Sequence, residues 1–134
     1  MVSVFLIYNG WGIFLLRIMV GLIFVAHGHR KIQDTAKTFA WLESEGFKPA
    51  PFWGWAVILS ELLGGLLLIL GLFTQIVALE LAIVMSVATL YNFKKNSPFF
   101  KVLELDLLLL VSLILLATLD GGYFSLNTFF GIYF

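Results

Sequence analysis

Two charged side chains stand inside long apolar runs of this sequence. Arg17 lies between Phe14-Leu15-Leu16 and Ile18-Met19-Val20, and Glu61 lies in a run rich in Leu, Ile and Gly. A charge in apolar surroundings is costly, by about 2.5–3.5 kcal/mol on membrane-insertion scales. We therefore predict that Arg17 and Glu61 form a buried ion pair. The alternative is that Arg17 extends to the membrane surface, as long cationic side chains do.

A second polar group is expected at one end of the helices. His27 and Lys31 follow the first apolar run, and Glu104 begins the last one. With Trp53 and Trp55, they supply donors, acceptors and aromatic surface for an amphipathic ligand such as a quinone. The alternative is that these charges fix the topology of the protein and the tryptophans anchor it at the membrane surface.

Other chemistries have less support in the sequence. There is no cysteine, which excludes disulfides, thiolate metal sites and iron–sulfur clusters. His27 and His29 do not share a helix face, so we expect neither a metal site nor a haem held by this pair. No phosphate-binding loop and no Ser/His/Asp arrangement is recognisable. We therefore predict no metal and no cofactor that is bound covalently or by clear ligands. A bound quinone stays open, and no catalytic residue is assigned.

The composition is that of an integral membrane protein. The chain has 134 residues, of which 61% are hydrophobic and 12% charged, and its mean hydropathy is +1.04. A small soluble domain cannot bury so many apolar residues. The formal net charge is zero, which gives no reason to expect a nucleic-acid partner. The first apolar run lacks a basic start and a small-residue cleavage site, so we predict a retained first span.

Four apolar runs are long enough to cross a bilayer. They are continuous and do not alternate, which excludes a transmembrane β-barrel. The prediction is an all-α polytopic membrane protein, a four-transmembrane-helix up-down bundle forming a single domain over residues 1–134. A short amphipathic segment over residues 35–45 is expected to lie at the membrane interface. The predicted spans are residues 5–27, 53–73, 76–93 and 102–119, with Thr74-Gln75 as the connection between the second and third.

Small residues share a face with the two buried charges. At about 100° per residue, Gly21 and Gly28 fall on the Arg17 side of the first helix. On the second helix, several glycines fall on the Glu61 side. Small residues let membrane helices approach closely, so these two faces are predicted to pack together. The second-helix glycines are Gly54, Gly64, Gly65 and Gly71.

The basic residues are distributed unevenly between the two sides. With Arg17 set aside as intramembrane, all seven remaining Lys and Arg residues lie in or beside the first and third loops. The positive-inside rule then places both loops in the cytoplasm and both termini outside. These residues are Arg30, Lys31, Lys37, Lys48, Lys94, Lys95 and Lys101.

Short motifs spread in order along the chain match a known membrane family. They are Leu16-Arg17, Gly21-Leu22-Ile23-Phe24, Ala26-His27-Gly28-x-x-Lys31, Glu61 to Leu68, Gly71 to Thr74, Glu104-Leu105 and Gly121 to Asn127. On these motifs the chain resembles the DoxX/DoxD-like membrane protein family. It departs from the family pattern at Asn127, where an aspartate is usual, and it lacks the arginine before the tyrosine.

The resemblance implies a four-helix protein of a bacterial or archaeal cytoplasmic (inner) membrane. Family members have been linked to a quinone-reducing, thiosulfate-oxidising membrane enzyme and to membrane complexes that handle oxidative and thiol stress. The hypothesis it favours is a small subunit or anchor of a redox-linked membrane complex that contacts quinone and is not catalytic alone. Its partners would then be the lipid bilayer and other protein subunits, or further copies of itself. Two alternatives remain open: a small-solute transporter, and a structural scaffold of a larger assembly.

Overall fold

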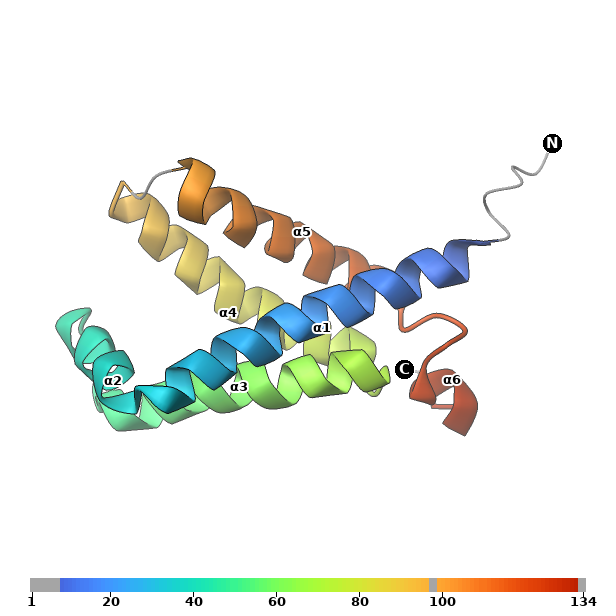
Figure 1. Ribbon diagram of the computed structural model, residues 1–134, viewed down its shortest axis with the longest axis horizontal. Coiled ribbons are helices and arrows are strands. Elements are labelled where there is room, and N and C mark those ends of the chain that lie inside the picture. The colour runs from blue at the N-terminus through green and yellow to red at the C-terminus, as the bar shows by residue number, and fades with distance from the viewer. Residues whose placement is uncertain (1–7, 97–98, 133–134) are drawn as a thin grey trace.

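The computed structural model describes residues 8–96 and 99–132, and within them every regular element is helical (Figure 1). Long helices alternate with short connections, and a short helix closes the described chain. In order, the elements are α1 (Asn9–Gln33), α2 (Thr35–Ser44), α3 (Ala50–Leu70), α4 (Thr74–Lys94), the π-helical turn η2 (Phe99–Leu103), α5 (Glu104–Leu119) and α6 (Leu126–Phe130).

Three of these helices are long and apolar enough to cross a membrane. Among the described residues they are α1, α3 and α4. The predicted all-helical fold with membrane-spanning helices is therefore confirmed for this part of the chain. The helix α5 alone has 16 residues, short of the roughly 20 that a span needs, so the fourth span stays a prediction. The segment over residues 35–45 is helical as expected, and its place at a membrane interface also stays a prediction.

Two helices have limits that differ from those of the predicted spans, while the spans themselves stay a prediction. The helix α1 continues beyond His27 to Gln33, because nothing between these residues breaks a helix. The start predicted near residue 5 lies outside the described residues. The helix α3 ends at Leu70 because Gly71 adopts a left-handed conformation with φ +71°, which favours glycine. The connection is therefore Gly71–Phe73, and Thr74-Gln75 already belongs to α4.

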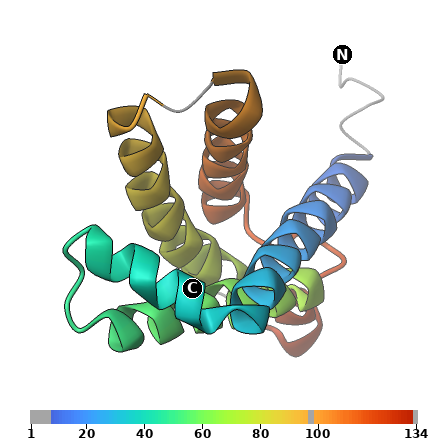
Figure 2. The ribbon, with the colours of Figure 1, turned by 60° about the vertical axis from the view of Figure 1, so that its left-hand side comes forward.

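The long helices form two pairs that diverge from one end. Helix α1 packs along α3, and α4 packs along α5. The pairs meet near the α3–α4 turn, which we call the turn end, and spread apart toward α2, which we call the α2 end (Figures 1 and 2). The shared core includes Phe24, Leu68, Leu81 and Leu113, which are fully or almost fully buried. This core closes the bundle at the turn end.

Two glycines bring α1 and α3 into close contact. A Cβ atom added to Gly21 would lie 2.7 Å from the carbonyl oxygen of Gly65, and one added to Gly65 would lie 2.7 Å from that of Gly21. Gly28 faces α3 in the same way, since its added Cβ would lie 2.7 Å from Cγ of Leu62. These contacts fix the register of the two antiparallel helices, with Gly21 level with Gly65.

We expect Gly65→Ala to destabilise the protein by about 1–3 kcal/mol, the usual effect of overpacking. The added methyl group would meet backbone atoms of α1, which cannot move aside as a flexible side chain can. Thermal unfolding in detergent measures the effect.

Gly12→Ala is the matched control, because an added Cβ at Gly12 has no atom within 4 Å. Equal melting temperatures for Gly65→Ala and the unmodified protein would show that the two helices are not in close contact here.

Candidate functional site

Arg17 is buried at the turn end and is held by backbone carbonyl groups. Its side chain is 1% exposed. Nη1 donates to the carbonyl oxygen of Gly121 at 2.5 Å, and Nη2 donates to that of Phe124 at 2.6 Å. The guanidinium carbon lies 5.6 Å from the centre of the Phe14 ring. The segment after α5 therefore folds back over α1 and supplies acceptors for both terminal nitrogens of this buried cation, while Nε has no hydrogen-bond partner among the described residues.

Glu61 is paired with Lys31. The side chain of Glu61 is 4% exposed, that of Lys31 is 34% exposed, and Nζ of Lys31 lies 2.5 Å from Oε1 of Glu61. Both predicted intramembrane charges are thus buried, but the predicted Arg17–Glu61 pair is wrong. The alternative, that Arg17 extends to the membrane surface, stays a prediction: the guanidinium points to the turn end, where the chain covers it.

The register of α1 and α3 explains the exchange of partners. Gly21 is level with Gly65, Arg17 lies one turn beyond this contact toward the turn end, and Glu61 lies one turn away from it in the other direction. Arg17 and Glu61 are therefore separated by roughly 12 Å along the helix axes. The extension of α1 past His27 instead places Lys31 on the same side of this contact as Glu61, within reach of its long side chain.

The Lys31–Glu61 pair lies in the wall of a cavity of about 710 Å³ at the α2 end. Most of the lining is apolar or aromatic, and it comes from the end of α1, from α2 and from the facing sides of α3 and α4. This is the size and character of a small-molecule pocket. The lining residues are Lys31, Trp41, Leu42, Glu45, Phe47, Trp53, Val57, Glu61, Ile83, Val84, Val87, Ala88, Leu90, Tyr91, Lys94 and Lys95.

The structure brings two of the five predicted ligand-site residues into this cavity. Lys31 and Trp53 line it, whereas His27, Trp55 and Glu104 do not. Trp55 packs edge-to-face against Phe39 of α2, with ring centres 6.2 Å apart. Glu104 is exposed at the start of α5, which contributes no residue to the lining. The predicted group of His27, Lys31 and Glu104 is therefore corrected to Lys31 and Glu61.

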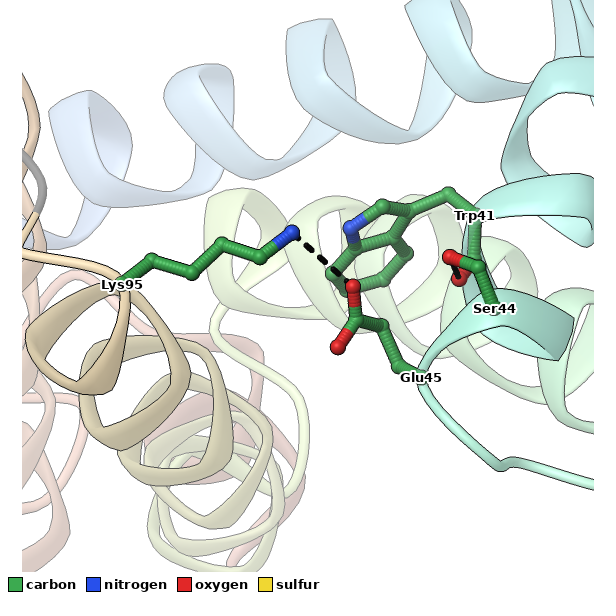
Figure 3. A network of polar contacts seen from close by, with 4 residues as sticks. All are labelled: Trp41, Ser44, Glu45 and Lys95. Carbon is green, nitrogen blue, oxygen red and sulfur yellow. Dashed lines mark hydrogen bonds and ion pairs between the residues drawn. The ribbon is translucent and has the colours of Figure 1, made fainter.

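The mouth of the cavity carries a cluster that the sequence analysis missed. Nζ of Lys95, just after α4, lies 2.9 Å from Oε1 of Glu45, just after α2 (Figure 3). Nζ of Lys95 also lies 4.7 Å from the centre of the Tyr91 ring, and Tyr91 meets Trp41 edge-to-face at 5.1 Å. We call Trp41, Glu45, Tyr91 and Lys95 the latch cluster. The sequence gives no sign that these residues form a site, because Trp41 and Glu45 lie far from Tyr91 and Lys95 along the chain. They come together only when α2 folds back.

The latch cluster shifts the pKa of both its charged members. The Tyr91 hydroxyl and then Lys95 hold the pKa of Glu45 below its ordinary value. The same hydroxyl and then Glu45 raise the pKa of Lys95. The Tyr91 hydroxyl is buried and has no hydrogen-bond partner among the described residues. The direct contact in the cluster is therefore the ion pair between Glu45 and Lys95. Glu45 and Lys95 are therefore both charged across the neutral range.

Two further polar contacts tie helices together away from the cavity. Asp106, which a helical wheel separates by about 200° from Glu104, turns to α4 and accepts a 2.7 Å hydrogen bond from Asn92. Asn127, whose departure from the family pattern left its role open, is buried and accepts a hydrogen bond from the backbone N–H of Phe73 at 2.8 Å. Its own N–H donates to the carbonyl of Gly71 at 3.0 Å. The C-terminal segment thus holds the α3–α4 turn as well as Arg17.

Within the described ranges, no three His, Asp or Glu side chains gather as metal ligands would. The arrangement offers instead one cationic donor, its carboxylate partner and aromatic walls. Such a site can bind and orient an apolar ring that carries hydrogen-bond acceptors.

Comparison with known proteins gives a family and one relative. The family model described as DoxX matches residues 12–93, which span α1 to α4. A protein of Bacillus subtilis (strain 168) named "Putative oxidoreductase CatD" is 33% identical to this chain over 118 residues. The match covers 88% of this chain and 86% of that protein. No solved structure matches this chain.

We expect Arg17→Lys to loosen the segment after α5. A lysine ammonium cannot donate to two carbonyl groups with the geometry of a guanidinium, so at least one buried carbonyl loses its partner. Such a group costs about 1–3 kcal/mol. The expected result is a lower melting temperature and faster proteolysis after Leu119. Arg30→Lys, at an exposed position on α1, should change neither, and equal behaviour of the two variants would contradict the role of Arg17.

The Glu45–Lys95 pair predicts a plateau of stability with pH. Because the pKa of Glu45 is lowered by folding, its contribution is present above its unfolded pKa and is lost as pH falls through the folded value. Because the pKa of Lys95 is raised, its contribution is present below its unfolded pKa and is lost as pH rises through the folded value. The difference in melting temperature between the unmodified protein and Glu45→Gln should therefore be constant around neutral pH and disappear in acid. A difference that disappears near neutral pH would contradict this.

Proposed function

This chain belongs to the DoxX family, and from that premise we propose that it is a small membrane subunit of a redox-linked complex that holds a quinone in the cavity at the α2 end. The name of its Bacillus subtilis relative, "Putative oxidoreductase CatD", is consistent with this class. The observation that carries the proposal is the Lys31–Glu61 pair in the wall of a largely apolar cavity.

The chemistry of the cavity matches that of a quinone ring. Nζ of Lys31 has three donors, one of which is taken by Glu61, so the others are available to a carbonyl oxygen of the ring. The carboxylate holds the ammonium group in place. Trp41, Trp53 and Tyr91 offer flat apolar surfaces for the ring, and a cavity of about 710 Å³ lies within the range of small-ligand sites.

The closed turn end favours a binding site over a transport path. The buried core that includes Leu68, Leu81 and Leu113 fills the bundle beyond the cavity. A solute entering at the α2 end would meet this core before it reached the other side. We therefore place the small-solute transporter and the purely structural scaffold second.

The proposed membrane topology extends the helices that the structure describes. We propose that η2 and α5, which follow one another from Phe99 to Leu119, cross the bilayer together as the fourth span. At about 1.5 Å per residue they reach about 30 Å. The helix α2 would lie at the interface. The basic loops would face the cytoplasm and both termini the outside of a bacterial or archaeal cytoplasmic membrane.

We expect Lys31→Gln to weaken quinone binding by about tenfold or more, since a hydrogen bond from a charged donor contributes about 1.5–3 kcal/mol. Quenching of tryptophan fluorescence by a short-chain benzoquinone, with the protein in lipid nanodiscs, measures the affinity. Trp41 and Trp53 line the cavity, so the saturable part of the quenching reports occupancy, while Trp11 and Trp55, which are exposed outside the lining, give a non-saturating background.

Lys37→Gln is the matched control, because Lys37 is exposed on α2 and does not line the cavity. Equal affinity for the two variants, or no quenching of the unmodified protein, would contradict the quinone site. Purification in mild detergent tests the subunit role, which predicts that a redox protein copurifies.

A further inference from the structure

The helix α2 forms part of the cavity wall. It follows α1 after Asp34, whose side chain caps it by accepting from the backbone N–H of Lys37, and it folds back over the start of α3. Its contribution to the lining is Trp41 and Leu42, and the residues just after it add Glu45 and Phe47. Movement of α2 away from α4 would therefore widen the opening.

One edge of α2 is attached firmly, to α3. The ring of Phe39 occupies the space where a side chain at position 54 would lie, since a Cβ added to Gly54 would clash with it. Phe39 also packs on Trp55, and Leu42 is buried. Gly54 thus provides a seat for α2, and this edge can act as a hinge.

The other edge of α2 reaches α4 through the latch cluster. Glu45 and Lys95 are in contact only through the ends of their long side chains (Figure 3). Trp41 and Tyr91 are in contact edge-to-face. The side chain of Lys95 is 54% exposed and that of Glu45 is 19% exposed, and ion pairs that border solvent in this way contribute little. All four residues line the cavity. The edge that must move to open the cavity is therefore the edge that is held by the weaker contacts.

We propose that α2 is a strap that controls entry to the cavity, and that the Glu45–Lys95 ion pair is its latch. The identity of the molecule that enters rests on the proposed function, whereas the gate rests on the packing of α2 alone. When the latch is closed, the cavity is shielded at its mouth. When it opens, α2 turns about its seat on α3 and exposes the Lys31–Glu61 pair.

The first experiment measures the gate without any quinone. The chain has no cysteine, so Ala88→Cys places a single thiol in the cavity lining. Its rate of labelling by a small thiol reagent should rise about threefold when Glu45→Gln removes the latch, the shift expected for loss of an exposed ion pair. Added salt should raise the rate with Glu45 intact and leave the Glu45→Gln rate unchanged, because salt screens the pair.

Glu43→Gln is the control, since it removes an acid from α2 that lies outside the latch cluster and does not line the cavity. Its labelling rate should equal that of Ala88→Cys alone. Equal rates for Glu45→Gln and Glu43→Gln would overturn the strap.

The second experiment closes the latch covalently. In Glu45→Cys/Lys95→Cys, a short reducible bis-thiol cross-linker replaces the two long side chains, and benzoquinone binding is followed by tryptophan quenching. Cross-linking should slow association of a fully substituted benzoquinone, which has no ring position for a thiol to add to. Cleavage of the cross-link by a reductant, followed by alkylation of the freed thiols and removal of the reductant, should restore it. The pair His29→Cys/Gln33→Cys, one turn apart on the exposed face of α1, should cross-link with no effect on binding.

The two experiments separate the two proposals. If the unmodified protein binds no quinone, the proposed function fails, and the labelling rates still decide whether α2 is a gate. If quinone binds and association is unchanged by the cross-link, the cavity keeps its proposed ligand and the strap is wrong.

Discussion

The contact between Gly21 and Gly65 sets the positions of the charged groups in this protein. The two helix backbones come so close that neither position has room for a side chain, and this defines which residues of α1 and α3 face each other. Arg17 then lies at the turn end, and Lys31 lies on the same side of the contact as Glu61 and within reach of it. In a bilayer, where apolar surfaces gain little by leaving lipid, such close packing is a main source of helix association. The register therefore determines the pairing of charges, and the charges do not determine the register.

The buried charges of α1 and α3, Arg17 and Glu61, are stabilised in different ways. Glu61 has a counter-charge in Lys31, and the pair remains next to a cavity. Arg17 has carbonyl oxygens of the segment after α5 and is sealed by it. One end of the molecule is thus closed by backbone groups around a cation, while the other retains a charged pair beside open space. This asymmetry accounts for the location of the candidate site at the α2 end.

Much of the fold could be predicted because it depends on apolar runs and on the spacing of small residues. The glycine face of α1 and α3 follows from a 3.6-residue period. The partner of Arg17 could not be predicted, because backbone carbonyl groups carry no signature in the sequence. Lys31 was assigned to the right region and the wrong partner: Glu104 begins the last apolar run at the same end, but folding leaves it exposed, and Lys31 reaches Glu61 instead. Glu45 and Lys95 resemble ordinary surface charges until α2 folds back over α3.

The anchoring of Arg17 also bears on how the protein is made. The guanidinium is bonded to Gly121 and Phe124, which lie 104 and 107 positions further along the chain. Translation delivers α1 long before these acceptors exist, so the first helix spends the whole of synthesis with an unsatisfied cation. Its two carbonyl partners become available only when Gly121 and Phe124 have been added. A chain that ends before Gly121 would leave the Arg17 guanidinium without both of them.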